Sequence, residues 1–217
     1  MIRLFCGFDH REAVGFNVFI RSVIESCKQP VAITPLAWKQ KDGSNAFTYA
    51  RFLVPYYCDF KGYAIWADGA DMLLRSDLAE LNIPTGAAVG VVKHDYKTQH
   101  PRKYIGTEME CSNEDYPRKN WSSLIVWDCS HYAHRVLTPD FVFKAEGKFL
   151  HGFEWLDESR IHSLDPLWNH LVSEQDHDPF AKLVHWTLGN PQFDHYKNAP
   201  FSQEWRAFAP RGTKPRN

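Results

Sequence analysis

Short apolar runs alternate with amphipathic stretches along the chain, and this pattern constrains the fold most strongly. Residues 2–8 form an apolar run that closes at Gly7 and Asp9, and residues 12–27 then carry apolar side chains at helical spacing. Further apolar runs lie at 30–36, 62–67, 87–92 and 122–127, and further helix-like stretches at 46–58 and 131–146. Strands that alternate with helices favour a mostly parallel sheet flanked by helices, so the sequence predicts an α/β fold.

The length of the chain fits one domain. Of its 217 residues 44% are hydrophobic, which suffices for one sizeable core and leaves little for a second. We expect a single domain over residues 1–209 and a disordered tail over residues 210–217. The polar stretch 93–120 shows no periodicity and contains Pro-Arg-Lys twice, which indicates a long loop or lid.

Charge and cysteine content bear on partners and location. Twenty-five Lys and Arg oppose 26 Asp and Glu, so the net charge of -1 gives no electrostatic case for nucleic acid or an anionic membrane as the main partner. Five widely spaced cysteines without a C-x-x-C pair indicate reduced thiols and a cytoplasmic protein. Since no apolar run has the length of a membrane span or a signal-peptide core, we expect no integral membrane segment.

The stretch WADGADMLLRSD, residues 66–77, places three carboxylates directly after an apolar run. In an open α/β sheet ligands bind at the carboxyl ends of the strands, where Asp68 and Asp71 would lie. Two adjacent carboxylates repel unless a cation lies between them, and hard oxygen ligands suit Mg²⁺ or Mn²⁺. The alternative is a surface turn built on Asp-Gly, with Asp77 as a helix N-cap.

A candidate third ligand, His185, ends the apolar run 183–184 and is followed by the Gly189-x-Pro turn. Imidazole is a common ligand of such metals, and the turn exposes backbone N–H groups to an anion. A core histidine bonded to a backbone carbonyl is the alternative.

Together these motifs resemble the GT-A glycosyltransferases, in particular bacterial and phage enzymes related to glycosyltransferase family 8. The resemblance rests on the acids after a strand, on Tyr-x-Arg at 49–51 before them, and on His-x-Thr-x-Gly-x-Pro at 185–191. Segments 117–123 and 164–169 also match, so it covers most of the chain. It implies a Rossmann-like GT-A fold and transfer of a sugar from a nucleoside diphosphate sugar, first of all a UDP sugar, with retention of configuration.

The resemblance also implies a metal site. In that family a D-x-D motif holds Mn²⁺ or Mg²⁺ and contacts the donor, whereas this chain has D-x-x-D. Asp71 would be the second acid of the motif, and Asp68 would reach the site through a bulge and contact metal or ribose. His185 would be the C-terminal metal ligand, and Gly189 and Asn190 would lie near the diphosphate.

Further donor-binding residues follow from the same resemblance. Phe8 and Asp9 would bind the nucleotide base, with a strand end and helix cap as the alternative. Arg51 would face the diphosphate or the donor sugar, with a salt-bridged surface arginine as the alternative. The donor sugar would be lined by Trp121 and Ser122.

The implied chemistry is metal stabilisation of the departing diphosphate. Glu154 lies about where the family places a glutamine or an acid against the sugar, so the candidate catalytic acids are Asp68, Asp71 and Glu154. The acceptor stays open among a glycan, a lipid-linked sugar, a protein and a modified nucleic acid. A nucleotide- or sugar-binding protein without turnover is the alternative function; an aspartyl phosphatase would need its acids after the first strand.

Overall fold

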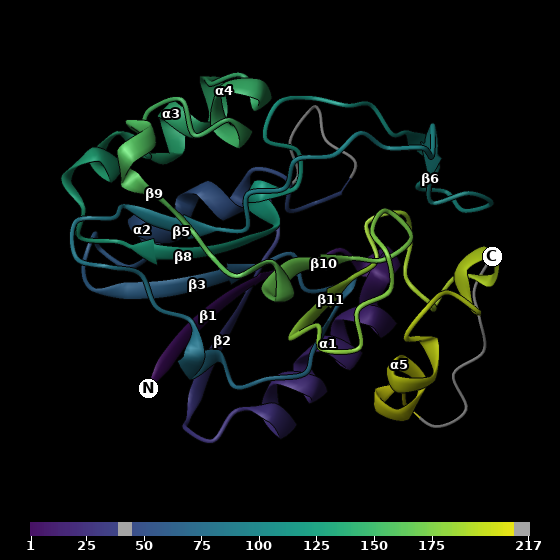
Figure 1. The fold of residues 1–217 in the computed structure, drawn as a ribbon. Coiled ribbons are helices and arrows are strands. Elements are labelled where there is room, and N and C mark those ends of the chain that lie inside the picture. The colour runs from purple at the N-terminus through teal and green to yellow at the C-terminus, as the bar shows by residue number, and fades with distance from the viewer. Residues whose placement is uncertain (39–44, 211–217) are drawn as a thin grey trace.

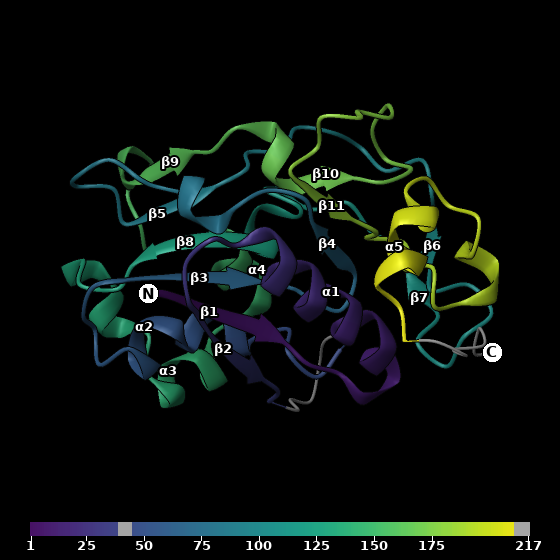
Figure 2. The ribbon, with the colours of Figure 1, turned by 90° about the horizontal axis from the view of Figure 1, so that it is seen from below.

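A six-stranded sheet forms the centre of the computed structural model, which describes residues 1–38 and 45–210. The strand order is β2-β1-β3-β8-β5-β9 (Figure 2). β8 runs antiparallel to both of its neighbours, and all other neighbouring pairs are parallel. The mostly parallel sheet predicted from the sequence is therefore confirmed. The strands are β1 (Ile2–Gly7), β2 (Val31–Leu36), β3 (Tyr63–Ala67), β5 (Val89–Val91), β8 (Leu124–Asp128) and β9 (Ile161–Ser163).

Helices cover both faces of this sheet (Figure 1). One face packs against α1 (Ala13–Ser26), and the other lies under α2 (Val54–Tyr57), α3 (Pro139–Lys144) and α4 (Gly147–His151). Successive residues of a strand point to opposite faces, so neighbours in β1 belong to different cores. Leu4 packs in the cluster that contains Phe19 of α1, whereas Phe5 packs in the cluster of the opposite face. The result is a three-layer α/β sandwich.

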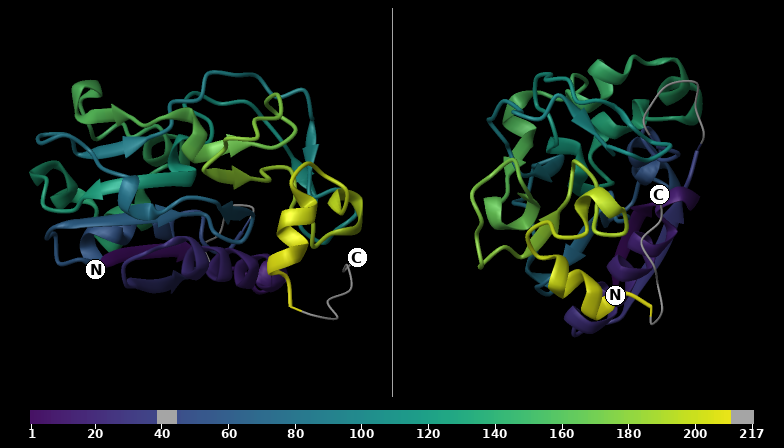
Figure 3. Two further views of the ribbon diagram at one scale, coloured as in Figure 1. Left: turned by 60° about the horizontal axis from the view of Figure 1, so that its bottom comes forward. Right: turned by 90° about the vertical axis from the view of Figure 1, so that its right-hand side faces the viewer.

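A second, three-stranded sheet lies beyond the carboxyl ends of β1 and β3 (Figure 2). It consists of β10 (His170–Leu171), β11 (Leu183–His185) and β4 (Met72–Leu74), with β11 antiparallel to β4. Figure 3 shows α5 (Ser202–Phe208) beside this sheet and apart from the central one. The sequence patterns did not predict this sheet, because its strands are only two or three residues long. It sets His185 opposite Met72.

The predicted element boundaries hold in part. The expected helix over 46–58 is two short pieces, a 3-10 helix at Ala50–Leu53 followed by α2, and Pro55 lies in the first turn of α2. The stretch 131–146 likewise divides into a 3-10 helix at Tyr132–Val136 and α3. Segment 93–120 is a long loop whose only strands are β6 (Arg102–Lys103) and β7 (Cys111–Ser112).

Residues 211–217 of the predicted tail lie outside the described residues. No helix among residues 1–38 and 45–210 is both long and apolar enough to cross a membrane.

Candidate functional site

The two acids of the D-x-x-D sequence lie on a tight turn between β3 and β4. The Ala70 N–H donates to the Asp68 carbonyl at 3.0 Å, and the Met72 N–H donates to the Gly69 carbonyl at 3.0 Å. Gly69 has a φ of +80°, a conformation that glycine adopts without strain. The extra residue is thus accommodated by a turn and not by a strand bulge. Both carboxylates are buried, and both line one cavity.

Asp68 is held by a buried ion pair. Its Oδ1 lies 2.8 Å from Arg51 Nη1 and also accepts a hydrogen bond of 3.0 Å from the Trp66 indole. Arg51 is only 5% exposed, so it is not a surface arginine, and it donates further to the carbonyls of Ser122 and Thr48. Burial raises the pKa of Asp68, and the opposing charge of Arg51 only partly offsets this effect.

Asp71 contacts His185, the residue predicted as its partner. His185 Nε2 lies 3.3 Å from Asp71 Oδ2, and His185 Nδ1 lies 2.9 Å from Asn169 Oδ1. The Asn169 amide nitrogen donates to the Asn120 carbonyl, which fixes the oxygen of that side chain toward His185. An amide oxygen can only accept, so His185 donates to Asn169 from Nδ1, and its Nε2 faces the carboxylate as a lone pair in the neutral ring or as a second donor in the imidazolium.

With the neutral ring, two acceptors face each other and require a cation or a shared proton between them. Asp71 also has a second buried oxygen, Oδ1, without a hydrogen-bond partner. Asp71 and His185 therefore form a two-ligand arrangement suited to a divalent metal ion. Asp68 is directed to Arg51 instead, and the part of the chain that the structure describes holds no ready-made group of three or more acid, histidine or cysteine ligands.

A buried polar network of Asn190 and Glu12 contacts the backbone of the turn that carries the two acids. The Asn190 side-chain amide donates to the Ala70 carbonyl at 3.0 Å and to Glu12 Oε1 at 3.1 Å. A Cβ atom on Gly15 would lie 2.1 Å from the same Ala70 carbonyl, so α1 requires glycine where it approaches the turn. Burial, and then the charge of Asp71, raise the pKa of Glu12 well above its usual value. Asn190 thus positions the acidic turn.

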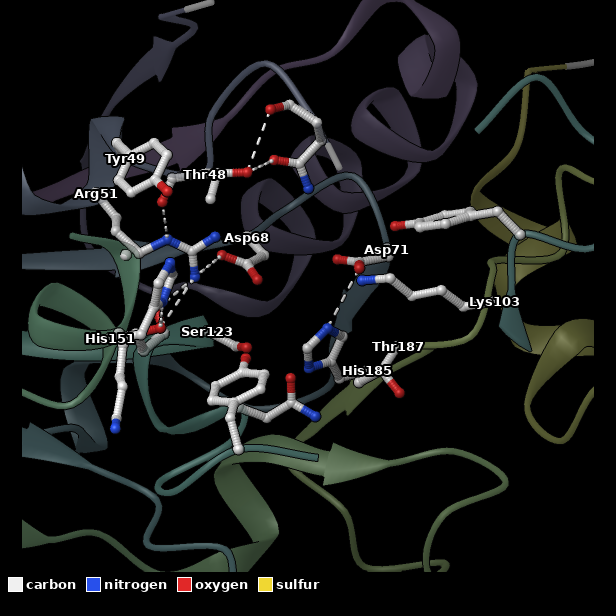
Figure 4. Close-up of a pocket in the computed structure, with 17 residues that line it drawn as sticks. Thr48, Tyr49, Arg51, Asp68, Asp71, Lys103, Ser123, His151, His185 and Thr187 are labelled. Carbon is white, nitrogen blue, oxygen red and sulfur yellow. Dashed lines mark hydrogen bonds and ion pairs between the residues drawn. The ribbon is translucent and has the colours of Figure 1, made fainter. Parts of the chain in front are cut away.

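The cavity in front of the turn has a volume of about 400 Å³ (Figure 4). Lys103 and Lys148 reach it and form no ion pair with any residue in 1–38 or 45–210. Lys103 extends into the same space as Asp71 (Figure 4). The other residues that line the cavity, besides the two acids, His185 and these two lysines, are polar or aromatic with one glycine. They are Asn45, Thr48, Tyr49, Arg51, Tyr104, Tyr116, Asn120, Ser122, Ser123, Gly147, His151 and Thr187. The cavity therefore combines carboxylates with unpaired cations.

Several lining residues were not predicted from the sequence. Lys103 lies in a Pro-Arg-Lys triplet that did attract notice, and that triplet was the only available signal. Tyr116, Lys148 and His151 lie in segments without a recognisable motif. They reach the cavity only because the long loop and α4 fold over the end of the sheet.

Other predicted residues lie outside this cavity. Phe8 packs edge-on against Phe16, with ring centroids 5.1 Å apart. Trp121 donates its indole N–H to the His94 carbonyl, and Gly189 and Asn190 do not line the wall. Glu154 is exposed and lines a separate cavity of about 390 Å³, so the structure offers no support for its contact with a reacting carbon.

Asp9 has the contacts of a structural cap. It is 1% exposed, and its carboxylate accepts hydrogen bonds from the backbone and guanidinium of Arg11 and from the backbone of Ala46. Burial opposes ionisation, but these hydrogen bonds outweigh it and lower the pKa of Asp9 to about 2. The cap alternative fits this geometry, while the base-binding role of Asp9 stays a prediction.

We expect Asp9→Asn to remove part of the pH dependence of stability. A carboxyl whose folded pKa is depressed stabilises the fold above its unfolded pKa, and this contribution disappears as the pH falls from about 4 to 2. The depression corresponds to about 2 kcal/mol at neutral pH. Urea unfolding at pH 7 and pH 3 should show a wild-type advantage that shrinks on acidification. Asp95→Asn, at an exposed aspartate, is the control, and parallel pH profiles for Asp9→Asn and wild type would contradict this prediction.

Comparison with known proteins supplies one clear relative. The chain is 35% identical to Protein CDI of Arabidopsis thaliana over 222 aligned residues, covering 94% of this chain and 84% of that protein. No profile of an established protein family matches the chain.

Solved structures share the fold at low sequence identity. The galactosyltransferase LgtC, solved with donor and acceptor sugar analogues, superposes with a TM-score of 0.61 and 12% identity, covering 95% of both chains. The bifunctional glycosyltransferase WbbM gives a TM-score of 0.62 and 16% identity, and this chain spans about half, 51%, of WbbM. GlyE of Streptococcus pneumoniae gives a TM-score of 0.59, with 95% of this chain and 59% of GlyE covered. The chain thus has the GT-A fold of glycosyltransferases, and by its sequence it belongs to the family of Protein CDI.

Proposed function

We propose that this protein transfers a sugar from a nucleoside diphosphate sugar, in the first place a UDP sugar, with the help of Mn²⁺ or Mg²⁺. The observation that carries the proposal is the pairing of Asp71 with His185, in which an imidazole nitrogen lies 3.3 Å from a buried carboxylate whose other oxygen has no partner. This pair lies at the end of β3 beside a cavity with unpaired lysines. The fold shared with glycosyltransferases adds support.

The donor set fits a divalent metal ion. Asp71 contributes a buried oxygen without a partner, and His185 contributes its Nε2 lone pair. Both hydrogen bonds to Asp68 go to Oδ1, and its Oδ2 would contact the ribose or, after a shift toward Asp71 and His185, the metal. When bound, the metal would supply positive charge that stabilises the departing diphosphate.

The protein's own residues would bind and orient the donor. Lys103 and Lys148 would attract the diphosphate, because no carboxylate among the described residues neutralises them. The rings of Tyr49 and Tyr116 give flat surfaces for the C–H groups of a sugar. Arg51 would act by fixing Asp68, since its guanidinium already donates to that carboxylate and to two backbone carbonyls.

A donor screen tests this function. The protein is incubated with UDP, GDP and ADP sugars and Mn²⁺ or Mg²⁺, and release of free nucleoside diphosphate is measured. We expect slow hydrolysis of one class of donor that stops with EDTA and with His185→Ala. Asp77→Ala, which removes a helix cap and a hydrogen bond from the Lys28 backbone, both outside the cavity, should keep it. Tight donor binding without hydrolysis or transfer, across a panel of acceptors, would favour the non-catalytic binding protein, and a failure to bind any of these donors would refute both.

We further propose that the sugar is transferred with retention of configuration and that the protein acts in the cytoplasm. Retention rests on the resemblance to family 8. Analysis of the product's anomeric configuration by NMR decides between retention and inversion.

A further inference from the structure

A second cavity of about 480 Å³ adjoins the donor cavity. The two cavities share part of their walls, so a molecule in one lies next to a molecule in the other. The shared residues are Tyr49, Lys103, Tyr116, Asn120 and Thr187. The second cavity adds Ser112, Asn113, Glu114 and Lys119, all from the long loop between β5 and β8.

Both Pro-Arg-Lys triplets of the sequence contribute their lysine to this second cavity. The arginines are neutralised elsewhere, because Arg102 pairs with Glu110 at 2.6 Å and Arg118 pairs with Glu158 at 2.6 Å. The lysines of the triplets, Lys103 and Lys119, both line the cavity wall. The two arginines of the triplets thus form ion pairs within the protein, while the two lysines line the cavity, where a ligand can contact them.

Lys119 has unusually weak charge compensation for a buried lysine. Its side chain is 8% exposed, and its ammonium donates to Asn113 Oδ1 at 2.9 Å. The nearest carboxylate, on Asp115, lies 3.5 Å away, is 41% exposed and already accepts a hydrogen bond from the Thr98 backbone. Burial lowers the pKa of Lys119 despite this carboxylate. A buried ammonium of this kind gains from an anionic partner.

Two lysines and one carboxylate line this wall, and the Asp115 carboxylate beside Lys119 lies outside the lining. Lys103 forms no ion pair with the described residues, and its one assigned contact is with the ring of Tyr104. Glu114 is the single carboxylate in the lining, and it accepts a hydrogen bond from Ser112. Tyr49 and Tyr116 add aromatic rings on which a sugar can stack.

We propose that the second cavity is the acceptor subsite and that the acceptor is a sugar bearing an anionic group, a phosphate or a carboxylate, bound by Lys103 and Lys119. Its role as an acceptor site rests on the proposed function. In the transfer, an acceptor hydroxyl oxygen bonds to the anomeric carbon as the bond from that carbon to the diphosphate breaks. The diphosphate leaves with the electron pair, and the hydroxyl proton passes to the diphosphate or to water.

The test measures binding of three probes by calorimetry in the absence of donor: glucose, glucose 6-phosphate and glucuronate. We expect at least one anionic sugar to bind wild type about 10-fold more tightly than glucose, and the stronger of the two identifies phosphate or carboxylate as the preferred group. Lys119→Met should abolish this preference, and Lys119→Arg should restore most of it. Arg102→Met, on the same loop but paired with Glu110, should preserve it.

The outcomes separate this proposal from the proposed function. Equal affinity for the three sugars, or a preference that survives Lys119→Met, overturns the anionic subsite even where UDP-sugar hydrolysis is observed. The anionic subsite is supported if Lys119→Met loses the preference for anionic sugars while its affinity for UDP-sugar and Mn²⁺ is unchanged. This is expected because Lys119 lines the second cavity and not the donor cavity. Anion binding without any donor binding overturns the acceptor role. If Lys119→Met does not fold, Lys103→Met, a half-buried site, tests the preference for anionic sugars in the absence of donor; its donor affinity is not compared, because Lys103 lines both cavities.

Discussion

Asp71→Asn is expected to reduce donor hydrolysis by roughly 10³-fold or more while the fold is retained. The substitution removes the negative charge that would hold the metal next to His185 and keeps the size of the side chain. The fold should tolerate it, because the Asp71 carboxylate has a buried oxygen without a partner, and its loss leaves no larger group to accommodate. An asparagine amide can donate to His185 Nε2 or accept from it, so thermal stability without metal should change little.

Two measurements check this result. Steady-state hydrolysis gives the loss in kcat/KM, and thermal unfolding with and without Mn²⁺ gives the stabilisation by metal, which should vanish in Asp71→Asn. Asp77→Asn is the matched control, since Asp77 lies on the same stretch but caps a 3-10 helix. Retention of Mn²⁺-dependent stabilisation in Asp71→Asn would show that the metal binds elsewhere.

Arg51→Met is expected to destabilise the fold by about 3 kcal/mol at pH 8, because it leaves Asp68 buried without its ion-pair partner. Without Arg51, burial dominates and the folded pKa of Asp68 rises further above its unfolded value. A carboxyl with a raised folded pKa favours the fold below the unfolded pKa, and that contribution is lost as the pH rises through the folded pKa. The defect of Arg51→Met should therefore shrink as the pH falls toward 4.

A double variant isolates the ion pair in this second prediction. Adding Asp68→Asn to Arg51→Met removes the buried charge, so the double variant should be more stable at pH 8 than Arg51→Met alone. Chemical denaturation of wild type, Arg51→Met, Asp68→Asn and the double variant at pH 8 and pH 5 completes the double-mutant cycle. A pH-independent loss in Arg51→Met, unrelieved by Asp68→Asn, would mean that the arginine acts through packing against Phe47 and Trp66 instead.

Five of the six strands of the central sheet could be predicted because they have clear local patterns, whereas β9, three residues long, was not predicted. The run at 2–8 and the helical spacing of 12–27 correspond to β1 and α1. Local patterns failed for the second sheet, whose strands β4, β10 and β11 are held by pairing between distant segments. Segment 72–74 reads as part of the acidic stretch, and only its pairing with 183–185 makes it a strand.

The candidate site could be predicted where residue type and position limited the chemistry. Asp71 and His185 follow apolar runs that end at the same edge of the fold, and they meet. Asn190 was expected near a diphosphate but is fully buried under the turn, because hydrogen bonds to Ala70 and Glu12 determine its position. Glu154 was assigned by its approximate place in the chain alone, and such an assignment carries no information on which way a side chain faces.

Asp71 and His185 are separated by 114 residues of chain, and they meet only when the turn after β3 pairs with a strand near the C-terminus. Closing so long a loop is entropically costly, so the proposed metal-binding pair should be among the last contacts to form during folding. Partly folded chains would then have no competent site. A ligand bound there would stabilise only the fully folded protein. Its release would favour local unfolding that starts at the C-terminal segments.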